Sequence, residues 1–129
     1  DIEGYNYFKT KCFLDPSKKF TSEHILVITK SLKDVMCLYK LGYQSISLQG
    51  EMNPLPNKVY EDLKQSGIDH MYCLYDNDKG GRQGTTGLIN QYNDIIPLFI
   101  PDEYGVKDLS DFIRVYGISD AQVLMDSLL

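Results

Sequence analysis

Short apolar runs alternate with amphipathic stretches along the chain from residue 25 onward. The apolar runs have strand length and little polar alternation, which is typical of parallel strands covered on both faces. The stretches between them repeat apolar residues at helical spacing, and strands alternating with helices through short loops predict a parallel sheet with right-handed crossovers. We therefore expect an α/β, Rossmann-like domain with a mainly parallel four-stranded sheet and flanking helices. The predicted strands span residues 25–28, 45–48, 71–75 and 95–100, and the helices between them span 32–39, 59–66 and 82–92.

The two ends of the chain differ from this alternating pattern. Residues 5–20 alternate aromatic and polar positions around a turn at Asp15-Pro16-Ser17, which predicts a short β-hairpin. After Asp108 two helices are expected, separated at Gly117. Pro97 within the fourth strand favours an edge position, because proline cannot donate to a strand ladder. We expect an N-terminal β extension over 1–22 and the main domain over 23–129.

Composition limits the class of protein. With 129 residues, 43% hydrophobic and 24% charged, the chain suits a single water-soluble domain, and no apolar run reaches the roughly 18 residues of a membrane span. Its three cysteines are odd in number and widely spaced, which indicates reduced thiols and an intracellular protein. A net charge of −5 argues against tight nucleic-acid binding by this chain alone. Because the chain begins at Asp1 without a leader, we expect a fragment of a larger polypeptide.

The stretch HMYCLYDNDKGGRQG, residues 70–84, carries the clearest chemical signal. Its apolar run ends in Asp76 and Asp78, which would lie at the carboxyl edge of the sheet, where ligands bind in open α/β folds. If the backbone stays extended, residues two apart point the same way, roughly 7 Å apart. Two such carboxylates could share a hard divalent cation, and the expected ion is Mg²⁺ with several waters retained.

Three other known arrangements of paired carboxylates fit this sequence less well. A calcium-binding EF-hand loop fails, because Gly80 and Gly87 stand where oxygen ligands are required. A response-regulator receiver is weak, because Thr29 and Lys30 follow the first strand where acidic residues are needed. A haloacid-dehalogenase-like pair would lie on the first strand, whereas this pair follows the predicted third strand. A polar turn in which Asp78 only caps the next helix stays open.

Three segments in order resemble the Toprim domain shared by bacterial-type DNA primases, topoisomerases and related nucleases. ILVITKSLKDVMCLYKLGY is similar to the first strand and helix of the family, with Asp34 at the position of its aspartate. YCLYDNDKGG is similar to its DxD segment, with Gly81 in place of the glycine that follows, and VKDLSDFI to the acidic segment after the fourth strand. The resemblance covers roughly residues 24–116 and is closest to phage primases and primase-helicases.

The resemblance implies Mg²⁺- or Mn²⁺-dependent nucleotidyl transfer, making RNA primers from NTPs on a single-stranded DNA template. It further implies a helicase domain or subunit as partner, no membrane, and a cytoplasmic location in a bacterial or phage-infected cell. The catalytic candidates are Lys30, Asp76 and Asp78, and the metal-facing candidates are Asp34, Asp76, Asp78 and Asp108. The candidates for phosphate or nucleic-acid contact are Lys33, Lys79, Arg82 and Lys107.

The chain departs from the family at one position. Lys30 and Ser31 stand where the family carries its catalytic Glu followed by Gly. Lys30 could pair with Asp76 or Asp78 and leave a catalytically silent module that binds nucleic acid or a partner. It could instead contact a nucleotide phosphate while the aspartates hold Mg²⁺. Glu51, at the end of the second strand, could also supply the missing carboxylate. A nuclease, as in other Toprim branches, is a third functional class.

Overall fold

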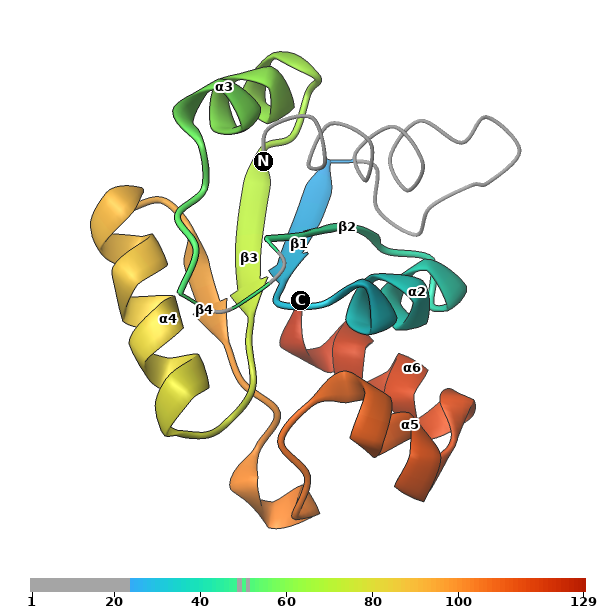
Figure 1. Ribbon diagram of the computed structural model, residues 1–129. Helices are drawn as coiled ribbons and strands as arrows, with labels where there is room; N and C mark the ends of the chain where they lie inside the picture. The colour runs from blue at the N-terminus through green and yellow to red at the C-terminus, as the bar shows by residue number, and fades with distance from the viewer. Residues whose placement is uncertain (1–23, 49, 51) are drawn as a thin grey trace.

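A parallel sheet of four strands forms the centre of the molecule (Figure 1). The computed structural model describes residues 24–48, 50 and 52–129, so the predicted N-terminal hairpin, the boundary at residue 22 and Glu51 lie outside the described residues. The strand order is β2-β1-β3-β4 and all three pairings are parallel, which confirms the predicted sheet. The strands are β1 (Ile25–Thr29), β2 (Gln44–Ser47), β3 (His70–Leu74) and β4 (Ile96–Leu98).

Helices cover both faces of the sheet, so the domain has three layers. Figure 1 shows α3 and α4 on one side and α2, α5 and α6 on the other. Within the described part of the chain, no helix is both long and apolar enough to cross a membrane. The helices are α2 (Leu32–Lys40), α3 (Asn57–Gln65), α4 (Lys79–Gln91), the 3-10 helix η1 (Asp102–Tyr104), α5 (Leu109–Tyr116) and α6 (Ile118–Leu128).

The two cores follow the alternation of side chains along the strands. Leu26 and Ile28 of β1 belong to the cluster that α3 and α4 cover, whereas Val27 belongs to the cluster that α2, α5 and α6 cover. These three side chains are fully buried, and burying each contributes roughly 1.5–3 kcal/mol. A central strand buried on both faces fixes the position of the residue that follows it, which is Lys30.

Several boundaries differ from the sequence-based expectation. Helix α4 begins at Lys79 instead of residue 82, because the Asp78 side chain accepts a hydrogen bond from the backbone N of Gly81 and caps the helix. Strand β4 is three residues long, shorter than predicted, and it lies at the edge of the sheet as Pro97 indicated. Gly117, with φ of 92°, separates α5 from α6 as expected.

Candidate functional site

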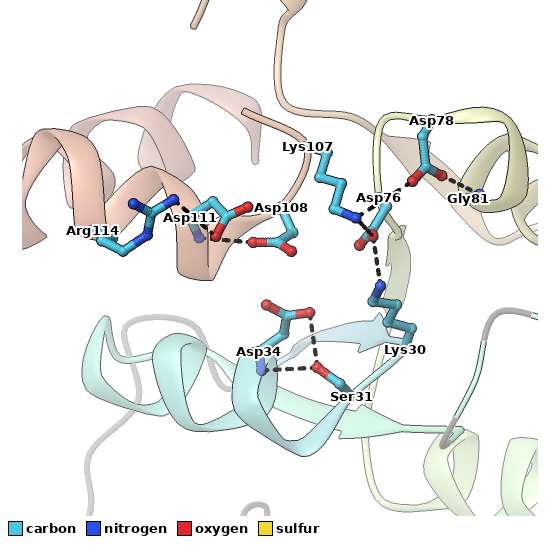
Figure 2. Close-up of polar contacts among 10 residues, drawn as sticks. All are labelled: Lys30, Ser31, Asp34, Asp76, Asp78, Gly81, Lys107, Asp108, Asp111 and Arg114. Atoms are coloured by element: carbon cyan, nitrogen blue, oxygen red, sulfur yellow. Dashed lines mark hydrogen bonds and ion pairs between the residues drawn. The ribbon is translucent and has the colours of Figure 1, made fainter. Parts of the chain in front are cut away.

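Six of the predicted site residues gather at the carboxyl edge of the sheet, as Figure 2 shows: Lys30, Asp34, Asp76, Asp78, Lys107 and Asp108. Strands β1 and β3 are neighbours in the sheet, so the residues that follow them meet at the same edge. Lys30 comes directly after β1, and Asp76 comes two residues after β3. Polar side chains that are 46 positions apart in the sequence are therefore placed in contact.

Lys30 and Asp76 form an ion pair at the centre of the site. Nζ of Lys30 lies 2.6 Å from Oδ2 of Asp76, whose side chain is 2% exposed against 29% for the lysine. The second oxygen, Oδ1 of Asp76, is buried and has no hydrogen-bond partner within the part of the chain that the structure describes. One oxygen of this carboxylate is thus neutralised by Lys30, while the other keeps its capacity to bind a cation or a donor.

Lys107 joins the two aspartates of the DxD segment. Its Nζ lies 3.8 Å from Oδ2 of Asp76 and 4.0 Å from Oδ2 of Asp78. The backbone N of Asn77 donates to the carbonyl of Lys107 over 2.8 Å, which ties the loop after β3 to the segment before α5. Half of the lysine side chain, 53%, is exposed, so its ammonium can also meet a ligand from solvent.

Asp78 has both a structural and an electrostatic position. Its Oδ1 accepts the backbone N–H of Gly81 at 2.8 Å, and its Oδ2 faces Lys107. Gly81 itself is required by a close approach, because a Cβ at this position would lie 1.8 Å from the carbonyl oxygen of Asp76. The capping interpretation is therefore correct, and it leaves one oxygen of Asp78 directed into the site.

Asp34 lies in the first turn of α2, where burial and neighbouring carboxylates disfavour its ionised form. Its Oδ2 accepts from the Ser31 hydroxyl at 3.1 Å, while Oδ1 is buried without a hydrogen-bond partner among the described residues. Burial, followed by the negative charge of Asp108, raises the pKa of Asp34 to about 6, against the opposing hydrogen bond from Ser31. The nearby charge of Asp76 raises this pKa further, whereas a hydrogen bond from the backbone N–H of Ser110, in the first turn of α5, lowers it.

Asp108 caps α5, accepting the backbone N–H of Asp111 at 2.7 Å. Figure 2 shows the carboxylates of Asp34, Asp76 and Asp108 around a common space. Three helices, α2, α4 and α5, begin at this site, and the partial positive charge of each N-terminus favours anions there. The site therefore combines concentrated negative charge with features that would also stabilise a phosphate.

The donor set fits a single hard cation better than a dedicated metal cage. Among the described residues, no group of three or more His, Cys, Asp or Glu side chains stands close enough to hold a metal ion. Mg²⁺ usually needs only one or two carboxylates, with water and substrate oxygens completing its octahedron. The two buried oxygens without partners, on Asp34 and Asp76, fit that requirement.

The candidate phosphate-contact residues are not equivalent. Lys33 and Lys79 are exposed, on α2 and at the start of α4. Arg82 donates to Oδ1 of Asn77 at 2.7 Å and lies 3.9 Å from Asp102, so the loop already engages it. An open cavity of about 430 Å³ adjoins the site, lined by Asn77, Asp102, Gly105, Val106, Lys107, Asp111 and Arg114.

Asn77, between the two aspartates, is a site residue that sequence reasoning missed. Its Nδ2 donates to the carbonyl of Ile100 at 2.7 Å and to Oδ1 of Asp102 at 2.6 Å. These bonds hold the loop after β3 against the segment after β4. An amide within a loop of carboxylates was the available signal, because asparagine can join two backbone segments through both ends of its side chain.

One solved structure shares the α/β fold of this chain. The crystal structure of the Aquifex aeolicus primase, comprising zinc-binding and RNA polymerase domains, is similar to this chain with a TM-score of 0.60 and 17% sequence identity. The match covers 96% of this chain and 28% of the primase chain, so the chain spans little more than a quarter of that protein's length. No family model matches the sequence, and no curated protein matches it.

Proposed function

We propose that the chain is a Toprim domain of a phage-type DNA primase and contributes the metal- and phosphate-binding part of a site for RNA primer synthesis. The observation that carries this proposal is the gathering of Asp34, Asp76 and Asp108 around a common space, with two buried carboxylate oxygens that have no hydrogen-bond partner among the described residues. The likeness of the fold to a bacterial primase supports it.

The residues of the site suit nucleotidyl transfer. A bound Mg²⁺ or Mn²⁺ would neutralise charge on the triphosphate oxygens of an incoming nucleotide. Asp76 and Asp34 would hold this ion, while Asp78 and Asp108 add negative charge around it. Lys107, which is half exposed and borders the 430 Å³ cavity, would bind a phosphate as a point charge.

Partners follow from this proposal. Single-stranded DNA template and NTPs would be the ligands, and a helicase domain or subunit would act beside the primase in the cytoplasm of a bacterial or phage-infected cell. The exposed ammonium groups of Lys33 and Lys79 lie on the helices whose N-termini reach the site, where they would steer phosphates toward it.

Primer synthesis by the full-length protein tests the proposal. Asp78→Asn keeps an oxygen that can cap α4 but removes the charge that faces Lys107. We expect Mg²⁺-dependent primer synthesis to fall by about 100-fold or more, as for loss of one electrostatic contact to a transition state. Asp120→Asn, an exposed aspartate on α6, is the matched control and should leave synthesis unchanged. Unchanged primer synthesis in Asp78→Asn would contradict the proposal that this site carries out nucleotidyl transfer.

The Lys30–Asp76 ion pair favours a second candidate, a catalytically silent module that binds nucleic acid or a replication partner. In that case the lysine neutralises the aspartate permanently. Thermal melting with added Mg²⁺ or Mn²⁺ separates the two candidates, since an ion that binds only the folded state raises Tm. A rise that disappears in Asp76→Asn supports the active site, and no response to either ion supports the silent module.

A further inference from the structure

The sum of the charges at the site matches the charge of one divalent cation. Four carboxylates, those of Asp34, Asp76, Asp78 and Asp108, gather at the carboxyl edge of the sheet, and two ammonium groups lie among them. With all six groups ionised the cluster carries a net charge of −2, which one divalent cation balances. A second divalent ion would leave the same cluster with a net charge of +2.

Lys30 contacts one particular oxygen of this cluster, Oδ2 of Asp76. Its Nζ takes Oδ2 of Asp76 at 2.6 Å, the distance of a strong charge-assisted hydrogen bond, and the carboxylate is 2% exposed. An ion bound to that oxygen would stand beside the ammonium in a poorly solvated site, where like charges repel far more than in water. The oxygens without a hydrogen-bond partner among the described residues are Oδ1 of Asp76, the second oxygen of this carboxylate, and Oδ1 of Asp34.

We propose that the Lys30 ammonium takes the place of a metal ion on Asp76, so that the site binds a single divalent cation through the remaining oxygens of Asp76 and Asp34. This inference rests on the proposed function, because it assumes that the site holds a metal. Lys30 is then a positioning residue that fixes Asp76 before the ion arrives.

Counting bound Mn²⁺ tests the inference without an activity assay. Electron paramagnetic resonance of free Mn²⁺ during a titration gives the number of ions held by the chain. We expect one ion in the wild type and two in Lys30→Glu, which adds a carboxylate where the ammonium was. Lys58→Glu, on α3 with a side chain that is 66% exposed, makes the same change in charge elsewhere and should bind one ion.

Lys30→Gln guards against a failure of Lys30→Glu to fold. Removing the positive charge next to the site should tighten binding of the first Mn²⁺ by about tenfold or more, because a repulsive contact is lost. Two ions in the wild type, no ion in the wild type, or an affinity unchanged by Lys30→Gln would each overturn the inference.

The two proposals fail in different ways. If one Mn²⁺ binds and the count responds to Lys30 as expected, but the full-length protein makes no primers, the function is wrong and the one-ion site stands. If primers are made and the wild type binds two ions, the function stands and the role given to Lys30 is wrong.

Discussion

The ammonium of Lys30 lies 2.6 Å from the carboxylate of Asp76, across the neighbouring ends of β1 and β3. This contact joins the residue that directly follows β1 to the first aspartate of the segment Asp76-Asn77-Asp78. Because the aspartate side chain is almost fully buried, the stability of the fold depends on cations that offset the cost of taking this carboxylate out of water.

Replacing Lys30 should expose that dependence. Lys30→Met removes the nearest cation and leaves a buried carboxylate, with Lys107 at 3.8 Å as partial compensation. We expect the free energy of unfolding to fall by about 2–4 kcal/mol in metal-free buffer, near the range for breaking a buried ion pair. Urea unfolding measures this loss, and millimolar Mg²⁺ should restore part of it.

A double variant is the control for this experiment. Lys30→Met combined with Asp76→Asn removes both charges and should be more stable than Lys30→Met alone, because no unpaired charge remains. A double variant as unstable as the sum of the two single variants would show that the ion pair has no coupling energy.

Two glycines of α4 make a matched pair. At Gly81 a Cβ would lie 1.8 Å from the carbonyl oxygen of Asp76, so Gly81→Ala must displace the backbone of the DxD loop. We expect a loss of about 2 kcal/mol or more, typical of a steric conflict with backbone. At Gly87 a Cβ meets nothing within 4 Å, so Gly87→Ala should raise stability by about 0.5–1 kcal/mol through helix propensity.

Differential scanning calorimetry of the two alanine variants measures this contrast. Both substitutions add one methyl group to the same helix, so helix propensity alone would stabilise them equally. An equal rise in Tm for both would show that the close approach at Gly81 does not constrain the fold.

Asp34 should make stability depend on pH. Its folded-state pKa of about 6 lies above its ordinary value of 3.8, so the folded state holds the proton more tightly than the unfolded state. The free energy of unfolding therefore falls as pH rises from about 4 to 6, by at most about 3 kcal/mol. Asp34→Asn should be more stable than the wild type at pH 7–8 in the presence of a chelator, and the advantage should vanish near pH 4.

Urea unfolding at several pH values tests the role of Asp34. The control is Asp120→Asn, which removes an exposed aspartate from α6 and should change stability little at any pH. A difference between Asp34→Asn and the wild type that stays constant from pH 4 to 8 would contradict the role assigned to this carboxyl.

The cap of α4 predicts different effects for two changes of Asp78. Asp78→Ala removes the acceptor for Gly81 and should destabilise the fold by about 1 kcal/mol. Asp78→Asn retains an acceptor and should stay within about 0.5 kcal/mol of the wild type. Thermal unfolding distinguishes them, and equal destabilisation by both variants would mean that charge, not the cap, is what the fold requires.

The sheet was predictable because burial on both faces leaves a signature in composition. Runs such as 25–28 and 71–75 contain almost only apolar residues, which identifies central parallel strands from the sequence. Helix starts were less predictable. The Asp78 cap advanced α4 by three residues, since a side-chain acceptor overrides the weak helix propensity of the two glycines that follow it.

The position of the candidate site in the fold could be predicted from the order of strands and helices, but the contacts between its side chains could not. That Asp76 and Asp78 end a strand could be read from residue order. That Lys30 contacts Asp76, and that Lys107 reaches both aspartates, depends on strand register and side-chain direction. The bonds of Asn77 to Ile100 and Asp102 join segments that a one-dimensional pattern does not relate.

The hydrogen bond from Asn77 to the carbonyl of Lys107 has a consequence for biosynthesis. A ribosome delivers the DxD loop about thirty residues before the segment that completes its surroundings. Asp76 is therefore synthesised before its partners, and its contact with Lys107 can form only after residue 107 has left the exit tunnel. A chain that ends between residues 99 and 106 would keep all four strands of the sheet and lack the part of the site that Lys107 and Asp108 supply.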